Sequence, residues 1–201
     1  MPADKKPDRR VSRSKQGLKA ALLELMEQKP FSSITTTEIV QRADFNRGTF
    51  YAHYEHKEAL LDDIMNDLLK DLVIAFRKPY KHVDSFELST LSASAVALFD
   101  HIYAHASLYK LMMDQRVLPG FREKVYRTMR ETANHDLTPG QASVPERLNE
   151  ELYYVYQYNA LLGLAFHWIQ EGFQHPPSYM AEQLVLFLNM RPSKMIVKHS
   201  G

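Results

Sequence analysis

Apolar residues recur along this chain at the three- and four-residue spacing that gives a helix one hydrophobic face. The first such stripe consists of Leu18, Ala21, Leu22, Leu25 and Met26. The helix that carries this stripe should end at the Lys29-Pro30 step, because proline disfavours helical backbone in the residue before it. The pattern therefore predicts an amphipathic first helix with one buried face.

The same spacing predicts further helices over residues 57–76, 88–105, 107–113, 119–135, 147–172 and 177–190. The helix over 88–105 depends on a stripe formed by Leu88, Leu91, Ala95, Leu98 and Ile102. Pro177 suits the first turn of the last helix, where its missing N–H is no loss, and a loop is expected at 137–145. Because no alternating apolar and polar stretch of useful length occurs, the sequence predicts an all-α protein of about nine helices.

Residues 34–58 carry the signals of two short helices joined by a tight turn. Thr35 and Glu38 have the spacing of a capping box, which begins the first of these helices. Asp44 tolerates the left-handed backbone that a tight turn requires, and Asn46 is a strong N-cap for the second helix. Behind a longer first helix, this arrangement predicts a three-helix DNA-binding unit.

The outward face of the second short helix suits contact with DNA. Phe45 and Phe50 can pack inward and fix the angle between the two helices. Arg47 can bind a guanine edge or a phosphate, and Gly48 removes side-chain bulk where the helix approaches the groove. Side chains that can donate to phosphate oxygens follow at Thr49, Tyr51, His53 and Lys57.

This stretch resembles the helix-turn-helix of the TetR family of transcriptional regulators. The matching positions are Ile34, Thr35, Ile39, Ala43, Gly48, Thr49, Phe50, Tyr51, His53, Lys57, Glu58 and Leu60, with conservative changes at Val40, Phe45, Asn46 and Tyr54. Asp44 stands where the family usually has glycine, so we expect a strained but intact turn. A helical domain that merely contains a tight turn would give no reason for Gly-Thr-Phe-Tyr-x-His on an exposed face.

The resemblance implies which side chains contact DNA. Phosphate contacts are expected from Thr36, Thr49, Tyr51, His53 and Lys57, and groove contacts from Asn46, Arg47 and Gly48. Arg13, near the start of the first helix, suits the DNA backbone and a plain solvated surface equally. One short recognition helix reads only a few base pairs, so we expect a homodimer on a palindromic double-stranded operator.

The last two predicted helices are similar to the dimerisation helices of one TetR subgroup. The similarity involves Gly163, Leu164, Trp168, Glu171, Gly172, Pro177, Met180, Ala181 and Leu184. In the family these helices pair with their symmetry mates as a four-helix interface. The expected interface residues share one helical face and are Leu152, Val155, Tyr156, Asn159, Gly163 and Phe166. The alternative is an ordinary core face within one chain.

Between the DNA-binding head and the dimerisation helices lie candidate walls of an effector pocket. They are Phe99, Ile102, Tyr103, Met112, Met113, Phe121, Tyr126 and Met129. In TetR-type proteins a ligand in this region moves the helix that corresponds here to residues 57–76 and spreads the recognition helices. We expect a small apolar or aromatic effector, although the same side chains also suit a plain core.

Charge and composition limit the kinds of partner and site that we expect. Residues 1–57 carry 11 Lys and Arg against 7 Asp and Glu, a net charge of +4, whereas residues 58–201 carry 14 against 17, a net charge of −3. A basic first quarter favours a polyanion as the partner. Cysteine is absent, which excludes disulfides and thiolate metal sites. His101 and His105 lie four residues apart but have no assured third ligand, so we expect neither a metal nor a cofactor.

These signals divide the chain into a disordered basic tail (1–9), a helix-turn-helix domain (10–57) and an effector-binding and dimerisation domain (58–201). The N-terminus has no apolar segment of the secretory type and no run approaches a membrane span, so a cytoplasmic protein is expected. We expect no enzyme, because the seven glycines form no phosphate-binding loop and no nucleophile elbow or paired-carboxylate motif occurs.

The sequence therefore predicts a dimeric transcriptional repressor that a small effector releases from its operator. Control by a protein coregulator or a metal, and activation in place of repression, stay open as alternatives. An all-α enzyme is the remaining and weaker one.

Overall fold

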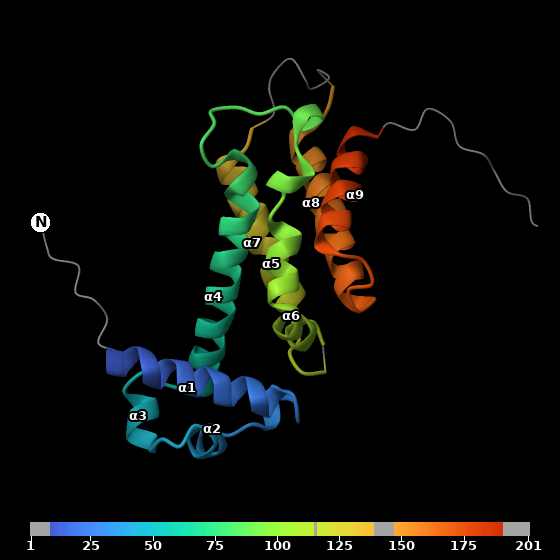
Figure 1. The fold of residues 1–201 in the computed structure, drawn as a ribbon. Coiled ribbons are helices and arrows are strands. Elements are labelled where there is room, and N and C mark those ends of the chain that lie inside the picture. Colours follow the sequence, from blue (N-terminus) through green and yellow to red (C-terminus); the bar gives the residue numbers. More distant parts are fainter. Residues whose placement is uncertain (1–8, 115, 139–146, 191–201) are drawn as a thin grey trace, which may run out of the picture. The chain divides into compact units, whose positions relative to one another are not determined.

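The structure is a computed structural model that describes residues 9–114, 116–138 and 147–190. In these ranges the regular elements are helices, as Figure 1 shows. The nine α-helices described are α1 (Arg9–Met26), α2 (Thr36–Arg42), α3 (Arg47–Tyr51), α4 (Lys57–Arg77), α5 (Leu98–Ala104), α6 (Ala106–Met113), α7 (Phe121–Asp136), α8 (Glu150–Gln170) and α9 (Pro177–Asn189). The predicted all-α class is confirmed. The predicted basic tail lies, except for its last residue, outside the described residues.

The chain divides into two compact units. The first comprises Met1–Asp71 and Ser107–Leu137, and the second comprises Leu72–Ala106 and Thr138–Gly201. The first unit therefore contains the three helices of the predicted helix-turn-helix, the first part of α4, and α6 and α7. The second contains α5, α8 and α9.

The core of the first unit forms around the first apolar stripe. All five side chains of that stripe are at most 6% exposed, which confirms its predicted buried face. Figure 1 shows α2 and α3 beside each other against α1, and Ile39 of α2 and Phe50 of α3 are completely buried. On α7, the ammonium of Lys124 pairs with the carboxylate of Asp62 on α4 at 2.9 Å. This core gives α2 and α3 a rigid base.

The second unit is built around Trp168 of α8. Its ring meets the ring of Phe99 on α5 edge-on, with centroids 5.6 Å apart. The indole Nε1 donates to the carbonyl of His175, in the connection to α9, at 3.0 Å. Helix α9 in turn packs against α5. Trp168 thus joins three segments of this unit, and its one polar atom is hydrogen-bonded as a buried indole requires.

Helix α8 ends in a Schellman motif, in which two backbone N–H groups close the last turn. The N–H of Gly172 donates to the carbonyl of Ile169 at 3.1 Å. The N–H of Phe173 donates to the carbonyl of Trp168 at 3.0 Å. Both Gly172 (φ 77°) and Phe173 (φ 66°) have left-handed backbone. This end turns the chain sharply toward α9.

The helix predicted over residues 88–105 is wrong in its first half. Only α5 is an α-helix there, and it is preceded by two 3-10 turns, η3 (Leu88–Thr90) and η4 (Ala93–Ala95). The backbone is extended at Leu91, between the two turns. The hydroxyl of Ser92 accepts from the N–H of Ser94 at 3.2 Å. Serine and threonine side chains compete in this way for the backbone groups that a helix would use, and the apolar spacing alone does not reveal it.

Candidate nucleic-acid interface

Helix α2 begins with the capping box that the sequence predicts. The hydroxyl of Thr35 accepts from the N–H of Glu38 at 3.3 Å, and the carboxylate of Glu38 accepts from the N–H of Thr35 at 2.9 Å. The ammonium of Lys29 also donates to Glu38. The hydrogen bonds from Lys29 and then from Thr35 lower the pKa of Glu38 to about 2. The start of α2 is therefore fixed by a charged and fully ionised cap at neutral pH.

The turn after α2 is a second Schellman motif, with an aspartate at its left-handed position. Asp44 has φ 55°, as predicted for this residue. Its N–H donates to the carbonyl of Gln41 at 3.3 Å, and the N–H of Phe45 donates to Val40 at 2.9 Å. The turn is intact without the glycine that the TetR resemblance would lead one to expect, because aspartate reaches this backbone at modest cost.

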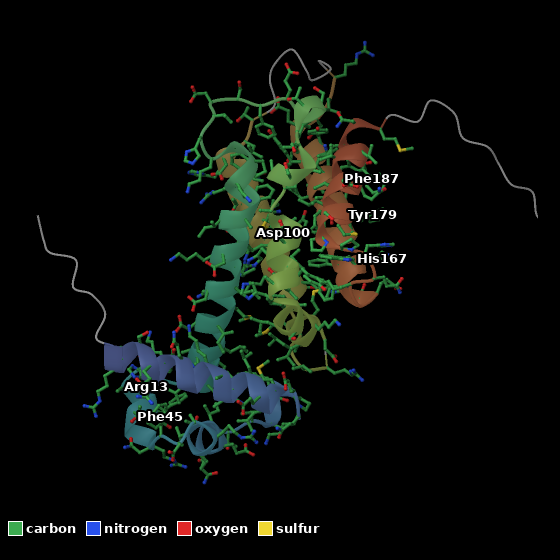
Figure 2. All side chains as sticks on the ribbon, viewed as in Figure 1. Arg13, Phe45, Asp100, His167, Tyr179 and Phe187 are labelled. Atoms are coloured by element: carbon green, nitrogen blue, oxygen red, sulfur yellow. The ribbon has the colours of Figure 1, made fainter. Side chains whose placement is uncertain are left out.

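Helix α1 lies close to the turn at Gly17. A Cβ atom added to Gly17 would meet Cε2 of Phe45 at 2.8 Å, which is too close for an ordinary contact. Figure 2 shows Phe45 below α1 in this part of the molecule. Gly17 therefore lets the ring of Phe45 pack against α1 and hold the turn in place.

Helix α3 is short and displays its polar residues to solvent. The side chain of Asn46 accepts from the N–H of Thr49 at 2.8 Å, so the predicted N-cap is confirmed. Phe50 is completely buried, whereas Tyr51 is 57% exposed. Arg47 and the adjacent glycine are also exposed. The helix is thus anchored by one aromatic ring and presents an exposed, basic face.

Arg47 makes a hydrogen bond across the turn. Its Nη2 donates to the hydroxyl of Thr37, on α2, at 2.6 Å. Thr37 is half-buried. Nothing in the sequence pattern pairs Thr37 with Arg47, and only the packing of α2 on α3 brings the two side chains together.

His53 and Lys57, both expected to bind phosphate, are engaged inside the first unit. Nε2 of His53 lies 2.7 Å from the hydroxyl of Ser14, a nearly buried residue of α1. The ammonium of Lys57 donates to the carbonyls of Phe31, Ser32 and Ile34, at 2.9, 3.1 and 2.6 Å. These bonds use all three ammonium hydrogens and tie the start of α4 to the segment before α2.

The two remaining expected phosphate donors and Arg13 are on the same unit. Thr36 is the first residue of α2, and both it and Thr49 are half-buried. Arg13 is exposed on α1, where Figure 2 labels it near Phe45. The first unit therefore carries every residue that the sequence analysis assigned to DNA.

A polar network joins α1 to α4 beside these residues. The hydroxyl of Tyr54 donates to the carboxylate of Asp63 at 2.7 Å, and the ammonium of Lys19 lies 3.0 Å from the same carboxylate. Partial burial opposes ionisation of Asp63, but the hydrogen bonds from Tyr54 and Lys19 outweigh it and lower its pKa. Burial, and then the bond to Asp63, raises the pKa of Tyr54. The network holds α4 against α1 and the segment after α3.

Two family models match the chain. The model for bacterial regulatory proteins of the tetR family matches residues 18–64, and a model for the C-terminal region of transcriptional regulators matches residues 89–190. This chain belongs to the TetR family. The matched models describe bacterial regulatory proteins and transcriptional regulators, so the family is one of regulators and not of enzymes.

Individual proteins agree with the family. The chain is 24% identical over 199 residues to the HTH-type transcriptional regulator YxbF of Bacillus subtilis, with 96% of this chain and 49% of that protein covered. It thus spans about half the length of that curated relative. Among solved structures, a TetR transcriptional regulator from Streptococcus agalactiae is 18% identical with a TM-score of 0.60, over 90% of this chain and 96% of that one. The dihydroxyacetone kinase operon activator DhaS is 15% identical with a TM-score of 0.52, over 88% and 94%. At these identities the two structures support the fold alone.

The residues expected at the dimer interface of this TetR-family chain lie on the outer face of α8. Leu152 is 65% and Tyr156 is 70% exposed. Asn159 and Gly163 are exposed as well, and Val155 and Phe166 are half-buried. Nothing lies within 4 Å of a Cβ added to Gly163. In the described part of the chain this face is open to solvent.

Helix α9 adds further large apolar side chains. Tyr179, Leu186 and Phe187 are 40%, 59% and 53% exposed, and Figure 2 labels the first and last of them on α9. These three residues are not among those expected from the sequence at the interface. Their mixed spacing along the last helix gave no reason to separate an outward apolar face from a core face.

The expected pocket residues are divided between the two units. Phe99, Ile102 and Tyr103 are on α5, where the first two are buried and Tyr103 is 51% exposed. On α6 and α7 the buried members are Met112, Met113, Phe121 and Met129, and Tyr126 is half-buried. The buried members serve as core within their own units.

The two histidines considered as metal ligands are in contact with each other. The rings of His101 and His105 have centroids 4.7 Å apart. Among the residues that the structure describes, no three His, Asp or Glu side chains gather as metal ligands would. In the same part of the chain no helix has the length and hydrophobicity of a membrane span.

Proposed function

We propose that this chain is a transcriptional repressor that works as a homodimer in the cytoplasm. In each subunit α3 enters the major groove of a palindromic operator. A small apolar or aromatic effector releases the dimer. The observation that carries the proposal is the surface of α3, where Arg47, Gly48 and Tyr51 are exposed while Phe50 is buried beneath them. In a helix-turn-helix the second helix lies in the major groove and contacts base edges with its N-terminal residues.

The side chains divide by role. Asn46, Arg47 and Gly48 face the base edges, where a guanidinium can bind guanine with two hydrogen bonds. Phosphates are bound by Thr36, Thr49, Tyr51, His53 and Lys57. His53 has Nε2 on the hydroxyl of Ser14, so it binds a phosphate through Nδ1, which must then carry a proton. Lys57 has its three ammonium hydrogens on carbonyls, so it reaches a phosphate by exchanging one of them.

The division of labour along the chain follows from these surfaces. Residues 10–57 form the DNA-binding head, and residues 58–201 form the effector-binding and dimerisation part. The exposed apolar side chains of α8 and α9 support a dimer, since a monomer would leave several large apolar residues in water. A dimer with a two-fold axis carries two α3 helices, one for each half of a palindrome.

The effector binds within the part of the chain formed by residues 58–201. This step of the proposal is supported by the family relationship and by the aromatic content of α5, α6 and α7. Binding favours one conformation of the dimer over another and so changes the spacing of the two heads. Activation in place of repression is the alternative; DhaS, a structural neighbour, is itself named an operon activator.

The DNA-binding part is tested by selecting operators from random duplexes with the full chain and measuring binding over a range of salt concentrations. Affinity should fall steeply with salt, because phosphate contacts release counterions. Arg47→Ala should lose discrimination between sequences, whereas Lys57→Ala should weaken all sequences alike. Equal small losses from both variants would contradict the assigned roles.

The regulatory part is tested with a panel of neutral aromatic and apolar compounds added to the dimer–operator complex, together with a reporter gene behind the operator. Repression and release by a compound in the panel support the proposal. A reporter that rises when the regulator is expressed indicates activation instead. Tight operator binding that no compound in the panel changes would contradict a small apolar effector.

A further inference from the structure

The two short helices of the DNA-binding head are joined by a polar contact between their exposed surfaces. Nη2 of Arg47, the first residue of α3, donates to Oγ1 of Thr37, the second residue of α2, at 2.6 Å. The two residues are separated by the left-handed turn at Asp44, which fixes the angle between the helices. The contact is therefore set by the fold of the turn and not by neighbours in the sequence.

We propose that Thr37 is a positioning residue that holds the guanidinium of Arg47 in the direction needed for base recognition. The inference rests on the proposed role of Arg47 in the groove. Thr37 itself need not touch a base. Thr37 affects which operator sequences are bound because it orients the side chain of Arg47.

The chemistry of the pair suits this role. An arginine side chain has many rotamers, and binding becomes weaker when it must lose them on contact with DNA. Threonine is branched at Cβ and therefore stiff about χ1, so its hydroxyl is a well-defined anchor. The bond uses one hydrogen of Nη2, and the guanidinium has five. Enough donors remain for a two-bond contact with guanine.

Arg42 shows the effect of a charged partner in place of a hydroxyl. Nη1 of Arg42, on α2, lies 3.2 Å from the carboxylate of Glu24 on α1. That contact brings a negative charge to Arg42 and opposes its use for DNA. The hydroxyl of Thr37 orients Arg47 without adding charge, so the attraction of the guanidinium to a polyanion is kept.

The test compares Thr37→Val with Thr37→Ser in the full-length protein. Valine keeps the shape and removes the acceptor, whereas serine keeps the acceptor. Thr128→Val, the same change on a half-buried threonine of α7, is the matched control. Thermal unfolding of each variant is measured first. Base preference is then measured by competition between the selected operator and single-base variants, and affinity for random duplex DNA is measured in parallel.

The base pair read by Arg47 is the one at which Arg47→Ala loses preference, by about 10-fold or more. Thr37→Val should lower preference at that base pair by roughly 3- to 10-fold while random-DNA affinity stays near wild type, because orientation and not charge is lost. Thr37→Ser should restore most of it. Thr37→Val should add nothing in the Arg47→Ala background, where the side chain it orients is absent.

Unchanged preference in Thr37→Val, or an equal loss on all sequences, would overturn the positioning role while leaving Arg47 as the reading residue. A failure of the proposed function has a different signature, in which Arg47→Ala itself keeps every base preference. Loss of preference in both Thr37→Val and Thr37→Ser would likewise overturn the inference, because serine retains the acceptor.

Discussion

The DNA-binding head and the outer face of α8 and α9 are both exposed to solvent, but their side chains are held in opposite ways. On the head, Arg47, His53 and Lys57 are polar and bonded to groups of the same unit. On α8 and α9 the exposed side chains are large and apolar, and Tyr156 is 70% exposed.

This difference separates a surface for a temporary partner from one for a lasting partner. Polar groups bonded within the head remain stable in water and can exchange their bonds when DNA arrives. A large apolar face gains stability only when another surface covers it, at about 25 cal/mol for each Å² removed from water. We therefore expect the α8–α9 face to be covered in solution at all times and the head to be covered only on DNA.

The largest effect is expected from a charge on the apolar face. Tyr156→Glu should convert a dimer into monomers, and operator affinity should fall by roughly 100-fold or more because one head binds only half a palindrome. Sedimentation analysis and operator titration measure the two effects. Val83→Glu is the matched control, since Val83 is also exposed (53%) but lies outside α8 and α9. A Tyr156→Glu protein that stays dimeric would contradict the assignment of this face.

A smaller effect should follow when the packing behind the turn is disturbed. Gly17→Ala places a methyl group 2.8 Å from Cε2 of Phe45. The ring or the helix must shift to make room, and this shift should lower the free energy of unfolding by about 1–3 kcal/mol. Urea unfolding measures the change. Adding Phe45→Leu to Gly17→Ala should recover part of the loss, because the smaller side chain leaves room for the methyl group. A stable Gly17→Ala protein would show that the contact of α1 with the turn is loose.

The local features of the head could be predicted because they depend on residues close together in the chain. Thr35 and Glu38 are three residues apart, and the cap at Asn46 involves the N–H of Thr49. Asp44 indicates a left-handed backbone by its residue type, because aspartate tolerates that conformation better than most residues. Such signals are complete within one turn of helix, so they need no knowledge of tertiary structure.

The long-range contacts could not be predicted from the pattern. His53 and Ser14 are 39 residues apart, and Lys57 meets carbonyls more than 20 residues earlier. Residues suited to phosphate by type were therefore found bonded within the unit. Apolar spacing favoured a helix in the segment before α5. There the N–H of Ser94 donates to the hydroxyl of Ser92 and not to a helical carbonyl. Polarity identified the candidates, but only packing determined their partners.

The left-handed residues at the ends of α2 and α8 allow a finer comparison. Asp44→Gly should raise the free energy of unfolding by up to about 0.5–1 kcal/mol, because glycine adopts φ 55° without strain although it makes the unfolded chain more flexible. The reverse change, Gly172→Asp at φ 77°, should lower it by a similar amount. Chemical denaturation of both variants measures the pair. If Asp44→Gly destabilises the protein, the carboxylate of Asp44 has a role in the turn that exceeds its backbone strain.

The smallest effect concerns the charged cap of α2 and its dependence on pH. The pKa of Glu38 is about 2 in the fold against an ordinary value of 4.5. Between these values the unfolded chain binds the proton more readily, so the stabilisation by Glu38 is complete above about pH 5 and disappears as the pH falls toward 2. Wild type should therefore be more stable than Glu38→Gln at pH 6, and the gap should narrow by pH 3. Because the carboxylate is exposed, 1 M salt should also narrow the gap at pH 6. A gap that is the same at pH 3 and pH 6 would mean that the amide caps α2 as well as the carboxylate does. The start of α2 would then be held by hydrogen bonds that need no charge on residue 38.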